Sequence, residues 1–102
     1  MRKTTIYGLY MIHGSTYIQS HDGYLIEQGC AVYRVDRGSW RVIDTRTGLA
    51  ICDGSSRAKA IDRFRDDYLD KLIVYRGKHA EDYKAKVERM NTLYEDYVKG
   101  TC

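Results

Sequence analysis

The spacing of apolar residues changes once along this chain, at Asp53-Gly54, and that change constrains the fold more than any other feature. Before it, apolar and polar residues alternate in short runs, as in residues 40–45, WRVIDT, which is typical of half-buried strands. After it, apolar residues recur every three or four positions, as in amphipathic helices. Because every strand-like run precedes every helix-like run, we expect an α+β fold.

The N-terminal half holds six strand-like runs, and each break contains turn-forming residues. The runs span residues 4–12, 16–20, 24–27, 30–35, 40–45 and 49–52. The breaks include His13-Gly14-Ser15, His21-Asp22-Gly23 and Asp36-Arg37-Gly38-Ser39. Because these connections are short, we expect an antiparallel meander of four to six strands over residues 4–52, in which neighbouring runs can merge.

Two helices are expected after the strands, over residues 56–76 and 79–99. Ser55 or Ser56 is suited to cap the first helix, and Gly77 and Gly100 are suited to end the two helices. The first apolar stripe consists of Ile61, Phe64, Tyr68, Leu72 and Tyr75. The second consists of Ala80, Tyr83, Val87, Met90, Tyr94 and Tyr97. We expect the first helix to pack on the sheet and the two helices to form an antiparallel hairpin. The second stripe is expected to be core, with a homodimer through residues 79–99 as the alternative.

The length and composition indicate one globular domain, residues 1–102. The 17 basic and 14 acidic residues leave a net charge of only +3, so any basic face must arise by segregation of charges. Three widely spaced cysteines, without a C-x-x-C pair, suggest reduced thiols and a cytoplasmic location. Cys30 and Cys52 are expected to be small buried strand residues. No apolar run is long enough to span a membrane.

The sequence contains no recognisable catalytic or metal-binding constellation. His13 and His21 fall at expected turns, and Asp22 adjoins the second, but no compact ligand spacing such as H-x3-H supports a metal site. A nucleophile elbow and a phosphate-binding glycine loop are also missing. We therefore expect neither an enzyme nor a bound cofactor or metal.

Basic and aromatic side chains gather in the segment that joins the sheet to the first helix. Within it, residues 39–64 loosely resemble two nucleic-acid-binding modules, the arm-binding domain of phage integrases and the C-terminal half of a double-stranded-RNA-binding domain. The resemblance rests on the Thr47-Gly48 turn and the SSRAKA helix start, residues 55–60, and implies contact with DNA or RNA. The chain departs from the RNA-binding family by one fewer basic residue in the opening turn and by lacking a matching helix before the strands.

Tyrosine and arginine dominate binding hot spots, and this chain has 10 tyrosines and no proline. In this general character it resembles small phage and mobile-element inhibitors of the anti-CRISPR type. That resemblance implies a non-catalytic, stoichiometric inhibitor of a host defence nuclease complex, whose partner is a protein or ribonucleoprotein. The alternative is a small module that binds DNA or RNA directly. The expected partner-binding residues are Tyr33, Arg34, Arg37, Trp40, Arg41, Arg46, Arg57, Lys59 and Arg63.

Overall fold

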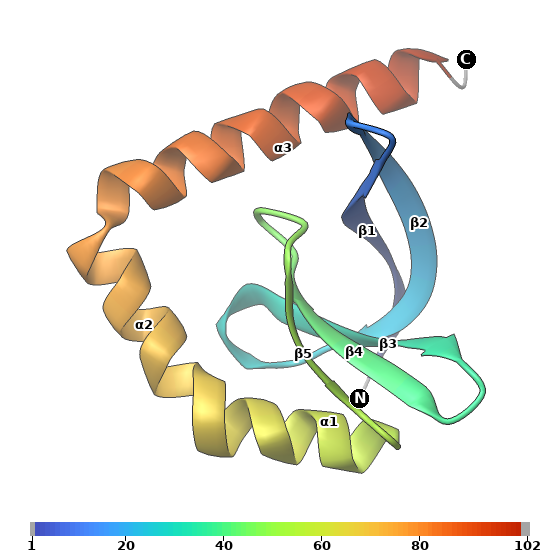
Figure 1. Cartoon of the computed structure of the whole chain (residues 1–102), viewed down its shortest axis with the longest axis vertical. Coiled ribbons are helices and arrows are strands. Elements are labelled where there is room, and N and C mark those ends of the chain that lie inside the picture. Colours follow the sequence, from blue (N-terminus) through green and yellow to red (C-terminus); the bar gives the residue numbers. More distant parts are fainter. Residues whose placement is uncertain (1, 101–102) are drawn as a thin grey trace.

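Five antiparallel strands precede the helices in the computed structural model, which describes residues 2–100 (Figure 1). The strands lie side by side in the order of the sequence, so the expected meander and the α+β fold class are confirmed. They are β1 (Lys3–Ile12), β2 (Ser15–Leu25), β3 (Cys30–Asp36), β4 (Ser39–Asp44) and β5 (Ala50–Gly54).

Strand β2 is longer than the sequence predicts, because the turn expected at His21-Asp22-Gly23 does not form. His21 pairs with Ile6 and Asp22 pairs with Thr5, so the second and third expected runs merge into one strand. Pairing along the whole of β1 supplies backbone partners that outweigh the local turn preference of the Asp-Gly pair. The chain then turns through a short 3₁₀ helix at Glu27–Gly29.

The β1–β2 hairpin curls over the face of the sheet that the helices leave open. Gly23 allows this bend, because a Cβ atom there would lie 2.6 Å from the Val32 carbonyl oxygen and 2.8 Å from Cδ1 of Ile6. The Leu9 amide donates a 2.9 Å hydrogen bond to the Gly48 carbonyl, which ties β1 to the β4–β5 turn. As a result this face has its own buried cluster, formed by Ile6, Ala31, Tyr33 and Ile43.

The helical segment that follows β5 covers the opposite face of the sheet. It comprises α1 (Arg57–Arg63), a π-helical turn (Phe64–Tyr68) and α2 (Leu69–Lys78), and it continues slightly beyond the expected stop at Gly77. Ser56 caps α1 by accepting a 3.1 Å hydrogen bond from the Lys59 amide, as expected. The main core forms beneath α1 from Cys30, Val32, Val42, Cys52, Ala60, Ile61 and Phe64.

Helix α3 (Ala80–Gly100) packs on the β1–β2 hairpin. His79 separates α2 from α3 in the chain. Figure 1 shows the two helices meeting at a corner, so the expected antiparallel hairpin of helices is not formed. The apolar stripe of α3 is used within the chain, because Tyr83 and Met90 are buried. A homodimer through residues 79–99 therefore stays a prediction.

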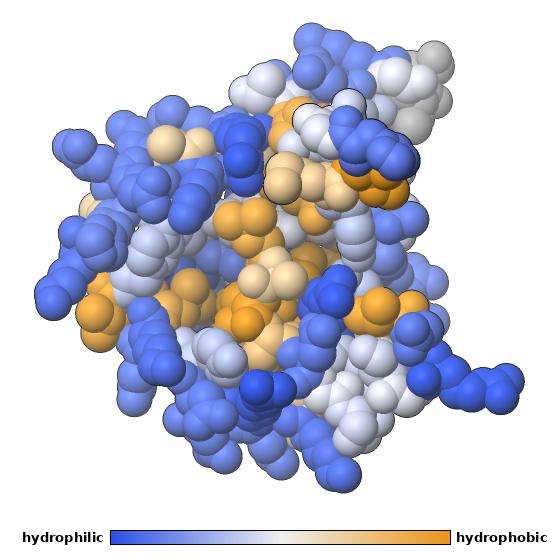
Figure 2. All heavy atoms as spheres, in the orientation of Figure 1, coloured by the Kyte–Doolittle hydropathy of each residue, from blue (hydrophilic) through white to orange (hydrophobic). Residues whose placement is uncertain are grey.

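The arc of helices encloses the apolar part of the molecule. Figure 2 shows hydrophobic residues gathered at the centre of the face between the three helices and the sheet, while the outer sides of the helices are hydrophilic. Within residues 2–100, none of the helices combines the length and hydrophobicity needed to cross a bilayer.

Candidate binding surface

The structure divides the expected partner-binding residues into buried, ion-paired and free side chains. Tyr33 is buried, with 1% of its surface exposed, so its ring cannot stack on a base or on a partner side chain. Arg41 donates to both carboxylate oxygens of Asp53, at 2.8 and 3.2 Å. Most of the remaining side chains are exposed. Tyr33 is therefore part of the interior, and Arg41 uses its charge in an ion pair within the sheet.

Tyr33 and Arg41 join a polar network on the face covered by the β1–β2 hairpin. The Tyr33 hydroxyl lies 2.5 Å from that of Tyr10, which is also 2.9 Å from Nε2 of His21. The His21 ring stacks on Tyr33 with a centroid separation of 4.1 Å. Burial, with a smaller contribution from the positive charge of Arg41, lowers the pKa of His21. The network thus holds the imidazole against Tyr33 in a setting that favours its neutral form.

Two further arginines are neutralised by carboxylates that connect the helices to the sheet. Nε of Arg65 lies 2.9 Å from a carboxylate oxygen of Glu27, and Arg76 lies 3.2 Å from the buried carboxylate of Asp44. Together with Arg41, these residues use their charge inside the molecule. The arginines that have no carboxylate partner within residues 2–100 are available to pair with another molecule.

Three cations without an ion pair lie beside aromatic residues on the helix-covered face, near the start of α1. Arg34 is directly opposite Trp40 across β3 and β4, and Lys3 is directly opposite Tyr24 across β1 and β2. The guanidinium of Arg57 lies 4.7 Å above the ring of Tyr24. We call Lys3, Tyr24, Arg34, Trp40 and Arg57 the basic–aromatic surface.

The cations of the basic–aromatic surface are exposed and carry no carboxylate partner. Within residues 2–100, Lys3, Arg34 and Arg57 form no ion pair, and neither does Arg37 in the adjacent β3–β4 turn. Strand alternation places Asp22 on the same face, but its carboxylate is not within ion-pair distance of them. The surface therefore combines a local positive charge with aromatic rings that are half-buried by α1.

The other expected cations lie away from this surface. Lys59 is exposed on α1. Arg63 is the last residue of that helix and donates a 3.3 Å hydrogen bond to the Asp53 carbonyl. Arg46 is in the β4–β5 turn, at a pocket described below. The nine residues singled out from the sequence therefore do not form one continuous site.

Two members of the surface, Lys3 and Tyr24, are not among the nine residues singled out from the sequence. The alternation of β2 predicts the face on which Tyr24 lies, which is the same face as that of Ile18. This prediction requires that residues 15–25 are taken as one strand. The position of Lys3 opposite Tyr24 follows from the register of the β1–β2 hairpin. The two-residue turn at His13-Gly14 determines that register.

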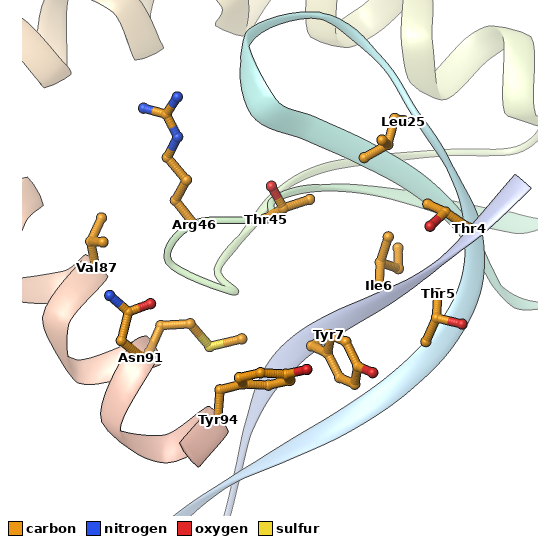
Figure 3. Close-up of a pocket in the computed structure, with 11 residues that line it drawn as sticks. Thr4, Thr5, Ile6, Tyr7, Leu25, Thr45, Arg46, Val87, Asn91 and Tyr94 are labelled. Carbon is orange, nitrogen blue, oxygen red and sulfur yellow. The ribbon is translucent and has the colours of Figure 1, made fainter. Parts of the chain in front are cut away.

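A pocket of about 410 Å³ lies between β1, the β4–β5 turn and α3. Figure 3 shows Tyr7 and Tyr94 on one side of the cavity, with Thr45 and Arg46 across from them. The rings of Tyr7 and Tyr94 meet edge to face with centroids 4.9 Å apart. Ile6 and Met90, which are nearly buried, supply apolar surface to its lining.

The residues with catalytic or metal-binding potential are dispersed. Within residues 2–100 no three histidine, cysteine or acidic side chains come together in a way that could hold a metal ion. Cys30 and Cys52 are buried strand residues with free thiols, as expected, and Cys102 lies outside the described residues. Burial and the neighbouring Asp44 carboxylate raise the pKa of Cys30 to about 12, which keeps it a thiol.

Comparison of the chain with models of protein families, with curated proteins and with solved structures gave no match. The function must therefore be inferred from the side chains themselves.

Proposed function

We propose that this chain is a non-catalytic binding protein that docks through its basic–aromatic surface onto an acidic macromolecular partner. The observation that carries the proposal is the division of the arginines. Arg41, Arg65 and Arg76 are neutralised by carboxylates, whereas Arg34 and Arg57 stand exposed beside half-buried aromatic rings. Exposed cations arranged around aromatic rings are enriched at binding hot spots.

The specific form that we propose is stoichiometric inhibition of a host defence nuclease complex, of the anti-CRISPR type. Docking would occlude an acidic or nucleic-acid-bearing face of that complex by contact alone. A non-catalytic role is supported by the state of the nucleophiles, because burial raises the pKa values of both Cys30 and Cys52. It is also supported by His21, whose imidazole is held in an internal network.

A second candidate function, direct binding of DNA or RNA, is favoured by the contact between Arg57 and Tyr24. Guanidinium groups alternating with aromatic rings are a common platform for single-stranded nucleic acids, in which bases stack while cations meet phosphates. The two candidates use the same surface and differ in the partner that it contacts.

A pull-down from bacterial lysate, with and without nuclease treatment, distinguishes the two candidates. A protein captured equally in both conditions supports the inhibitor, and capture that disappears with nuclease supports nucleic-acid binding. Direct binding to random duplex or single strands should in that case fall steeply with salt, because phosphate contacts release counterions.

The surface is tested by reversing its two arginines, Arg34→Glu with Arg57→Glu. Capture of the partner is expected to weaken by at least about tenfold, since two attractive charges become repulsive. The matched control is Lys84→Glu with Arg89→Glu, which makes the same charge change at exposed positions of α3. Both variants should melt close to the wild type, because the affected side chains form no ion pair within residues 2–100. Undiminished capture by the first variant would exclude this surface as the docking site.

A further inference from the structure

Strand β5 is an edge of the sheet whose outer side has no partner strand. Within residues 2–100 it pairs only with β4, and no backbone hydrogen bond reaches its outer side. The Asp53 carbonyl points away from β4, because it accepts a 3.3 Å hydrogen bond from the side chain of Arg63. In an antiparallel strand the amide and carbonyl of one residue face the same way, so the Asp53 amide is also directed outward. The outer side of β5 therefore offers backbone groups to an added strand.

A groove runs along this edge of the sheet. It consists of two adjoining hollows, of about 290 and 100 Å³, which share Ala50 and Ile51 of β5. Its other wall comes from the helical segment, through Arg63, Tyr68 and Leu72. Ile51, Tyr68 and Leu72 are only partly buried against the main core. The groove thus has strand backbone on one side and partly exposed apolar side chains on the other. We call it the β5 groove.

The larger hollow of the β5 groove carries a positive charge that is not neutralised within the described chain. Arg41 and Asp53 pair with each other across β4 and β5, at 2.8 Å. Arg63 lines the same hollow, and within residues 2–100 its guanidinium forms no ion pair. The guanidinium lies 6.0 Å from the centroid of the Tyr68 ring. A carboxylate that entered the groove beside Tyr68 would therefore meet an unpaired cation.

We infer that the β5 groove binds an extended peptide segment of a partner protein, which adds a further strand beside β5. Alternate side chains of a strand point to the same face of a sheet. On the helix-covered face, an acidic side chain of the segment pairs with Arg63. An apolar side chain two positions away packs against Ile51, Tyr68 and Leu72. The segment that fits is therefore one in which an acidic and an apolar residue are two positions apart.

A second copy of this chain fits the edge less well than a separate peptide. If two β5 strands paired about a twofold axis, both sets of helices would lie on the same side of the seam. The two Arg63 side chains would then approach one another, and each groove would receive a cation instead of the carboxylate that it lacks. Like charges oppose such a pairing.

Fluorescence anisotropy with a labelled nine-residue peptide, TETVTETVT, tests the groove. In this probe glutamate and valine share one face of the extended chain, and threonine forms the other. It is expected to bind saturably with one-to-one stoichiometry, and at least about tenfold more tightly than the same peptide with lysine in place of glutamate. Arg63→Glu should reverse that preference. Lys59→Glu, the matched control, makes the same charge change at an exposed position of α1 outside the groove and should preserve it.

Backbone N-methylation of the probe tests whether it binds as a strand. Methylating the alternate amides that face β5 should abolish binding, whereas methylating the intervening amides should leave most of it. Near-ultraviolet circular dichroism checks that Arg63→Glu is folded. If it is not, Arg63→Gln replaces it and should remove the preference for the glutamate peptide.

The basic–aromatic surface and the β5 groove are tested independently. Arg34→Glu with Arg57→Glu should leave binding of the probe unchanged, because neither residue lines the groove. The inference fails if the probe does not bind, if the two methylated series bind equally well, or if the Arg63 variants keep the wild-type charge preference. A concentration-dependent dimer in analytical ultracentrifugation that the probe dissociates would assign the edge to a second copy, and would likewise overturn it.

Discussion

Asp44 is the residue on which the buried polar contacts converge. Its carboxylate accepts hydrogen bonds from the Tyr83 hydroxyl at 2.7 Å, from Arg76 at 3.2 Å and from the Arg46 amide at 2.9 Å. It thereby connects β4 to α2, to α3 and to its own following turn. Asp44 is only 3% exposed, so these partners replace the water that its charge has lost.

Asp44→Ala is expected to destabilise the protein by about 3–5 kcal/mol, because it leaves the largely buried guanidinium of Arg76 without its counter-charge. Urea unfolding measures the loss. Asp36→Ala is the control, since Asp36 is exposed and forms no ion pair within residues 2–100, and should change stability by about 0.5 kcal/mol or less. Equal effects of the two substitutions would show that Asp44 has no special role.

His21 is expected to make the stability of the protein depend on pH. Burial lowers its pKa below the usual 6.5, so the unfolded chain binds the proton more tightly than the folded one. The contribution of neutral His21 is therefore complete above the unfolded value and is lost as pH falls toward the folded value. His21→Gln should flatten the fall in stability between about pH 7.5 and pH 5.5. His13→Gln, in the exposed β1–β2 turn, is the matched control for the removal of one histidine.

At the scale of single elements, the crossing of α1 over β5 depends on an absent side chain. A Cβ atom on Gly54 would lie 2.5 Å from the Ala60 amide nitrogen and 2.7 Å from its Cα. Both contacts are with backbone, which cannot rotate away. Helix α1 can therefore lie against the end of β5 only with glycine at this position.

Two glycine-to-alanine substitutions are expected to have opposite effects. Gly54→Ala should destabilise the protein, because it forces α1 away from the core formed by Ala60, Ile61 and Phe64. Gly77→Ala meets nothing within 4 Å and lies inside α2, so it should stabilise by about 0.5–1 kcal/mol. Thermal melting of the two variants checks the signs, and a stable Gly54→Ala protein would contradict this packing.

Local sequence patterns were sufficient to predict most elements. The change of period at Asp53-Gly54, the Ser56 cap and the stripe from Ile61 to Tyr75 predict the segment from β5 through α2, because each depends on nearby residues. The turn expected at residues 21–23 does not form, because this part of the structure depends on residues that are distant in sequence. Whether an Asp-Gly pair turns or continues a strand depends here on β1, which is distant in sequence.

The candidate site was predicted only in part, because its composition depends on the whole molecule. Arg34, Trp40 and Arg57 were expected from the clustering of basic and aromatic residues, but their separation from Arg41 and Tyr33 was not. Alternation places Arg41 and Tyr33 on the other face of the sheet, and only the curl of the β1–β2 hairpin makes that face an interior. Tertiary packing decides which face of the sheet becomes buried, so no local sequence pattern reveals it.

The contact between α3 and the β1–β2 hairpin joins the two ends of the described chain. Tyr7 meets Tyr94 and Tyr97, and Ile18, which is only 7% exposed, lies at the same junction as Leu93. During synthesis the β1–β2 hairpin leaves the ribosome before helix α3, which covers it. A nascent chain therefore carries a bare apolar hairpin until residues 80–100 have been translated, and this interval is when it is most exposed to aggregation or to capture by a chaperone.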